Sequence, residues 1–170
     1  MRLSKTVPHR RFLSALLVLV LLATACSGGS KDPAPAPDVA PAAQQLGREI
    51  GETFLLLLDD TKAMLALNLP VEQLRPALGM LRDDYRVRFA NLGCLREAME
   101  VNGRSQVQDI AAALVLARGG MDRPWLEQAK TRYAADAEMP ALLAGIETLR
   151  VYAFLDELAR LRPGETILCN

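Results

Sequence analysis

From residue 42 onward, apolar residues recur every three to four positions, and this spacing constrains the fold more than any other feature. Hydrophobic residues make up 51% of the 170 residues but aromatic residues only 5%, so the apolar content is mostly Leu and Ala, which favour helices. Only residues 166–169 alternate in the manner of a strand, and they have no partner strand. We therefore expect an all-α domain over residues 42–170, a small bundle of about five helices.

The helix boundaries follow from proline and glycine. Pro41 suits a first turn, Asn102-Gly103 and Pro163-Gly164 are stop signals, and Pro76 marks a new start after a short turn. The expected helices occupy residues 41–69, 71–101, 106–118, 124–139 and 141–162.

A leader precedes the expected domain. Residues 1–11 contain four basic residues and no acid, and residues 12–23 form an uncharged apolar run. This order is typical of a secretory signal peptide. The run of about a dozen residues is shorter than the ~20 that a membrane-spanning helix needs, which disfavours a permanent transmembrane anchor. Residues 1–25 are therefore expected to be a signal peptide.

The end of this leader resembles a bacterial lipobox. The residues before Cys26 read Leu22-Ala23-Thr24-Ala25, which are small or apolar. The resemblance implies that Cys26 becomes the mature N-terminus and carries a diacylglycerol, and that its acyl chains anchor the protein in a membrane. Ser27 follows instead of Asp, which by the same resemblance implies the inner leaflet of a bacterial outer membrane, facing the periplasm.

Residues 26–41 connect the anchor to the domain. After the cysteine they read SGGSKDPAPAPDVAP, with no apolar period. Such a composition cannot bury enough surface to fold, and its proline-rich half is expected to be extended by about 3.1 Å per residue. We expect a disordered tether. A proline-rich recognition motif is the alternative.

The leader also contains the only histidine, His9. Without it, the mature chain has no Ser-His-Asp or Cys-His nucleophile and no histidine for a zinc site. Removing the four basic residues of the leader from the total of 20 leaves 16, against 20 acidic residues, so the mature charge is about −4. No basic cluster points to nucleic acid. We expect no enzymatic activity, no metal site, no cofactor and no nucleic-acid partner.

The two other cysteines are Cys94 and Cys169. With Cys26 attached to lipid, an even pair remains in an oxidising compartment, which predicts a disulfide between them. The alternative is two unpaired thiols.

The sequence GETFLLLLDD contains five consecutive apolar residues, at positions 54–58. They cover more than one face of a helix, so this helix is either central and buried all round or open on one face. In the second case Phe54, Leu55, Leu56 and Leu58 are candidate partner-binding residues. Gly47 and Gly51, four residues apart, would permit another helix to approach closely.

These features predict a membrane-anchored lipoprotein of the periplasm that acts as a non-enzymatic protein-interaction or scaffold module. Its layout of lipid anchor, compact helices and one disulfide is similar to that of pilotins, small helical lipoproteins that chaperone secretion-channel subunits. The expected partners are the membrane, through the lipid, and an unidentified envelope protein. The alternative is a carrier of lipid or of a small apolar ligand, with a cavity between the helices.

Overall fold

A computed structural model describes residues 40–169, and every regular element in this range is helical, which confirms the all-α fold. The elements are α1 (Pro41–Ala66), α2 (Val71–Glu97), α3 (Val101–Ala117), α4 (Pro124–Arg132), α5 (Met139–Glu147), the 3₁₀ helix η1 (Leu149–Ala153) and α6 (Leu155–Leu161). None of these helices is both long and apolar enough to cross a membrane. The leader, Cys26 and the expected tether lie outside the described residues.

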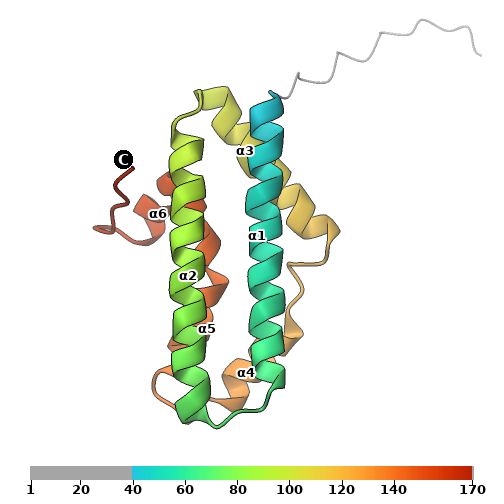
Figure 1. Ribbon diagram of the computed structural model, residues 1–170, viewed down its shortest axis with the longest axis vertical. Coiled ribbons are helices and arrows are strands. Elements are labelled where there is room, and N and C mark those ends of the chain that lie inside the picture. The colour runs from blue at the N-terminus through green and yellow to red at the C-terminus, as the bar shows by residue number, and fades with distance from the viewer. Residues whose placement is uncertain (1–39, 170) are drawn as a thin grey trace, which may run out of the picture. The chain divides into compact units, whose positions relative to one another are not determined.

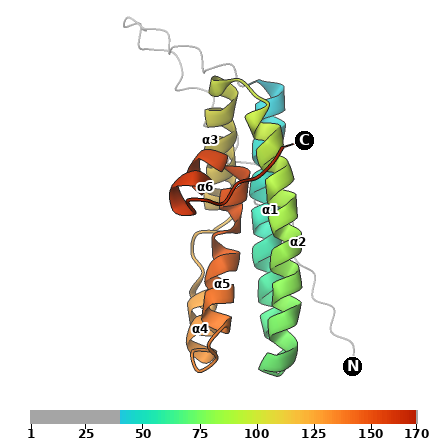
Figure 2. The same ribbon diagram turned by 90° about the vertical axis from the view of Figure 1, so that its left-hand side faces the viewer.

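The helices pack as a bundle in which the last column is broken into short pieces. α1 and α2 form a long antiparallel hairpin, and α3 runs beside α1 in the same direction (Figure 1). After α4, the chain returns along α2 through α5 and η1, and α6 turns away from this column (Figure 2). Apolar side chains from all of these elements share one core, with Phe54, Phe89 and Tyr152 among its largest fully buried members.

The contact between α1 and α3 depends on the two glycines of α1. A Cβ atom at Gly47 would lie 2.7 Å from Cβ of Ile110 and 2.9 Å from the carbonyl oxygen of Val107. A Cβ atom at Gly51 would lie 2.9 Å from a methyl carbon of Leu114. Their four-residue spacing therefore allows the backbones of α1 and α3 to approach as the sequence predicted.

The expected helix over residues 141–162 is wrong as a single element, because it is divided into α5, η1 and α6. No proline or glycine marks either break. Residues 151–154 are all buried, and a regular α-helix cannot turn four consecutive side chains toward one core. The tighter 3₁₀ turn and the extended Phe154 place all four against the bundle.

The boundaries of the second and third helices also differ from those expected. α2 ends at Glu97 and α3 already begins at Val101, so Asn102-Gly103 lies inside the first turn of α3. The Arg104 guanidinium donates to the carbonyl oxygens of Glu97 and Met99 (both 2.9 Å), which closes the short connection. Pro76 lies inside α2 and does not begin a new helix.

The fourth expected helix is shorter than predicted, since α4 ends at Arg132. One Asp136 carboxylate oxygen accepts hydrogen bonds from the backbone N–H groups of Glu138 and Met139 (both 2.9 Å), and these bonds lower the pKa of Asp136. Asp136 thus starts α5 in the manner of an N-terminal cap.

The disulfide between Cys94 and Cys169 is present and joins α2 to the C-terminal tail. The tail is also held by Glu165, which accepts hydrogen bonds from the Tyr152 hydroxyl (2.6 Å) and from Arg86 (2.5 Å). Arg162 donates to the same Tyr152 hydroxyl (2.6 Å). Residues 166–169 form no strand.

Candidate functional site

The four candidate residues of the apolar run do not form one surface. Phe54 and Leu58 belong to the core, and Phe54 exposes only 1% of its surface. Leu55 is half-buried beside Gly120 at the end of α3, whereas Leu56 points outward and is 54% exposed. The central-helix interpretation therefore holds for Phe54 and Leu58, and of the four only Leu56 is an exposed side chain.

Phe54 instead forms part of the floor of a cleft beside α3. We call it the α3–α6 cleft. It has a volume of about 150 Å³ and is lined by residues from α1 (Ile50, Gly51, Phe54), α3 (Gln108, Ala111, Ala112, Val115), η1 (Arg150), the η1–α6 junction (Phe154) and α6 (Glu157).

The lining of the α3–α6 cleft divides by polarity. Its floor is made of core aromatic and aliphatic side chains, whereas Gln108, Arg150 and Glu157 supply the polar groups. An apolar recess with a few convergent polar groups is the usual form of a binding site in proteins.

Two arginines lie over the Phe54 ring, and within residues 40–169 one of them is ion-paired. The guanidinium carbons of Arg123 and Arg150 are each 5.7 Å from the ring centroid. Arg123 also contacts the Glu147 carboxylate at 3.2 Å. Arg150, which is half-buried, forms neither an ion pair nor a hydrogen bond with any residue of the range 40–169, and the same is true of Glu157. Within the described part of the chain, the cleft therefore presents one cation and one anion without ionic partners beside an apolar floor.

The size of the cleft limits what can enter it. An apolar cavity of about 150 Å³ accepts a molecule of benzene size, whereas pockets for drug-sized ligands begin at about 300 Å³. The α3–α6 cleft therefore fits one aliphatic or aromatic side chain and is too small for a long acyl chain.

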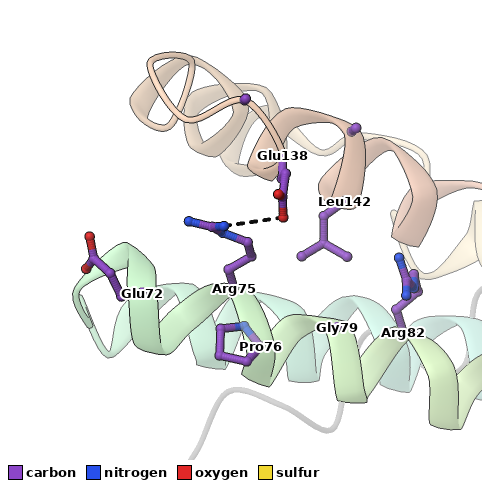
Figure 3. A pocket seen from close by; sticks show the side chains of 9 residues that line it. Glu72, Arg75, Pro76, Gly79, Arg82, Glu138 and Leu142 are labelled. Atoms are coloured by element: carbon purple, nitrogen blue, oxygen red, sulfur yellow. Dashed lines mark hydrogen bonds and ion pairs between the residues drawn. The ribbon is translucent and has the colours of Figure 1, made fainter.

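A wider groove lies between α2 and the start of α5 (Figure 3). It has a volume of about 780 Å³ and is open to solvent, with Pro76 and Gly79 on its floor. Arg75 reaches across it to Asp136 (2.9 Å) and Glu138 (3.3 Å), and Arg82 contacts Asp83 at 2.8 Å. Its arginines are thus already paired with carboxylates, which makes it a weaker candidate than the α3–α6 cleft.

The described part of the chain has two tyrosines with shifted pKa values and no cluster of metal-binding side chains. Residues 40–169 contain no group of three or more His, Cys, Asp or Glu side chains arranged to hold a metal ion. Burial and a 2.6 Å hydrogen bond to Asp60 raise the pKa of Tyr85 far above its ordinary value, so this hydroxyl stays protonated. Burial and the bond to Glu165 raise the pKa of Tyr152 in the same direction. Both tyrosines act as structural hydrogen-bond donors to carboxylates.

Sequence reasoning missed the residues that form the rim of the α3–α6 cleft. Ala111 and Ala112 read as ordinary helix residues, and Arg150 as part of a continuous helix. Arg150 between Leu149 and Val151 was the signal available in the sequence, but its partial burial and its lack of an acidic partner depend on the fold. Comparison with protein-family models, curated proteins and solved structures finds no match to this chain.

Proposed function

We propose that this protein is a lipid-anchored, non-enzymatic binding module of the bacterial cell envelope, and that it holds an apolar side chain of a partner protein in the α3–α6 cleft. The observation that carries the proposal is the cleft itself: an apolar floor with Phe54 at its base, bordered by Arg150 and Glu157, neither of which is ion-paired within residues 40–169. Buried apolar anchors surrounded by a polar rim are the usual source of affinity in protein interfaces.

The cleft volume favours a protein partner over a lipid. A carrier of acyl chains needs a long apolar tunnel, whereas this cleft has room for one side chain. A single side chain in a cleft of this size gains about 1.5–3 kcal/mol from burial, so the rest of the affinity would come from the surrounding surface.

The lipid anchor rests on the sequence around Cys26, and its test is independent of the cleft. Labelling with radioactive palmitate is expected in the wild-type chain and absent in a Cys26→Ser variant. Equal labelling of the two chains would disprove lipidation at Cys26, but it would leave the binding cleft untouched.

The cleft is tested by two matched substitutions on α3. Ala112 and Ala113 are both exposed, but only Ala112 lines the cleft. An Ala112→Trp side chain is expected to occlude the cleft, whereas Ala113→Trp adds the same bulk to α3 outside it. Both variants should keep the wild-type helical circular dichroism.

The measurement is quantitative mass spectrometry of proteins that co-purify with the tagged full chain in detergent. Envelope proteins recovered with the wild type and with Ala113→Trp should be lost with Ala112→Trp. Equal recovery with all three chains would show that the cleft is not the binding site.

A further inference from the structure

The α3–α6 cleft is the deep end of a longer groove. A second hollow of about 320 Å³ lies beyond it, between the start of α3 and the start of α6, and is lined by Val101, Arg104, Ser105 and Asp156 among others. Gln108 lines both hollows, and the neighbouring residues Asp156 and Glu157 of α6 line one each, so the two hollows adjoin along α3. We call the two together the α3 groove.

The length of the α3 groove matches a short helix. On α3 it runs from Val101 to Val115, and at 1.5 Å per residue these fourteen steps span about 21 Å, or four helical turns. The groove side of α3 carries the small residues Ser105, Ala111 and Ala112, which allow a backbone to approach closely.

The two helices that border this groove, α3 and α6, also carry exposed apolar residues. Leu116 is 69% exposed and follows Ala112 by four residues, so it lies on the same side of α3. Leu161 is 55% exposed and follows Glu157 by four residues on α6. A helix that lies along this side of α3 would cover Leu116, and this burial adds to what one side chain in the cleft contributes.

The charges of the groove differ between its two ends. At the shallow end Arg96 contacts Asp156 (2.8 Å) and Glu97 (3.0 Å), and Arg104 contacts Glu97 (2.7 Å), so these groups neutralise one another. At the deep end Arg150 and Glu157 have no such partners within the described residues. A half-buried arginine without a carboxylate is an incomplete ion pair, and its planar guanidinium is suited to bidentate recognition of a carboxylate.

We infer that the occupant of the α3 groove is an amphipathic helix of a partner protein, with an apolar anchor in the cleft and an acidic side chain one turn away that pairs with Arg150. A basic side chain on the other flank of the anchor would meet Glu157. This inference rests on the proposed function, because it assigns the partner chemistry of the same cleft.

The test is a selection from a phage-displayed library of 14-residue peptides with an alanine-rich helical framework. The central position is Leu or Phe, and the positions three and four residues to either side are randomised. The targets are the full chain in detergent and its Arg150→Glu and Ala112→Trp variants, each first shown to keep the wild-type circular dichroism and thermal transition.

The wild type is expected to enrich Asp or Glu one turn from the anchor, and Arg150→Glu is expected to enrich Lys or Arg at the same position. The Ala112→Trp chain should enrich no sequence above background. Replacing the selected acid by its amide should weaken binding of the synthetic peptide to the wild type by about tenfold or more, and leave its binding to Arg150→Gln within twofold.

Two results would overturn the inference. If the selected peptides need an open cleft but show no preference for an acid, or keep the same preference with Arg150→Glu, the pairing with Arg150 is wrong and the proposed function stands. If the wild type enriches nothing over Ala112→Trp, the groove does not bind helices. In that case the co-purification experiment decides separately whether the cleft binds protein at all. Partners that co-purify with Ala113→Trp but not with Ala112→Trp would show that it does.

Discussion

Gly93 in α2 lies directly against the backbone carbonyl oxygen of Tyr152 in η1, and a Cβ atom at this position would overlap that oxygen. The next nearest atom, 3.3 Å away, is the Cα of Ala153, so no flexible side chain can move aside. Gly93→Ala is therefore expected to push η1 away from α2 and to lower the free energy of unfolding by about 2–4 kcal/mol. Urea unfolding followed by circular dichroism measures this. A loss below 0.5 kcal/mol, taken as the rough limit for ordinary surface changes, would contradict the contact.

Gly79 in the same helix gives the opposite expectation. No atom lies within 4 Å of where its Cβ would be, so alanine fits without strain. Because glycine in a helix interior costs about 0.5–1 kcal/mol relative to alanine, Gly79→Ala should raise the free energy of unfolding by that amount. The same urea titration serves as the matched control for Gly93→Ala. A destabilised Gly79→Ala variant would contradict the open space at Gly79, which lies in the wide groove between α2 and α5.

The disulfide is expected to contribute to stability without defining the fold. It closes a loop with a sequence separation of 75 residues, and the chain-entropy relation assigns about 4 kcal/mol to such a loop. A chain with both Cys94→Ser and Cys169→Ser should keep its helical circular dichroism, since α2 and η1 pack without the bridge. Its urea midpoint should fall. An unfolded double variant would show that the bridge is required for folding.

The tail contact of Glu165 predicts a dependence on acid pH. The hydrogen bond from Tyr152, followed by the charges of Arg86 and Arg162, lowers the pKa of Glu165. A carboxyl group whose pKa is depressed by folding stabilises the protein fully above its ordinary pKa of about 4.3, and this stabilisation is lost as the pH falls through the folded value.

The Glu165→Gln variant should therefore be less stable than the wild type by about 1 kcal/mol at pH 7, and the difference should shrink below about pH 4. Asp136 also has a lowered pKa, but it is present in both chains and cancels from the difference. Unfolding free energies between pH 3 and pH 7 measure the effect. A difference that stays constant with pH would mean that Glu165 is not bound as a carboxylate.

The two arginines over Phe54 are expected to differ in how much each contributes to folding stability. Arg123 is paired with Glu147, so Arg123→Gln should cost about 1 kcal/mol of folding stability. Arg150 has no acidic partner in residues 40–169, so Arg150→Gln should change stability by less than about 0.5 kcal/mol. Thermal unfolding of the two variants compares them directly. A large loss with Arg150→Gln would assign Arg150 to folding and remove its role as a free binding group.

The long helices could be predicted from the sequence because each carries its own signal. Pro41 begins α1, Pro70 separates it from α2, and the spacing of Leu and Ala residues identifies both helices. The glycine pair of α1 also predicted its close contact, since small residues four positions apart lie on one face. The division of the last helix at Thr148 and Phe154 had no such signal, because it arises from the packing of residues 151–154 against α2.

The sequence by itself determined the helical class, because residue spacing is a local property of the chain. It also predicted the Cys94–Cys169 pairing, given the assignment of Cys26 to lipid. It also identified Phe54 as important, but it could not say whether Phe54 faces the core or a partner. Only the tertiary structure decided that α1 is buried there, and that α3 and α6 leave a cleft above Phe54. The reason is physical. Whether a side chain is ion-paired, buried or exposed depends on neighbours that are distant in sequence, and the periodicity of one helix does not specify which other helix packs against it.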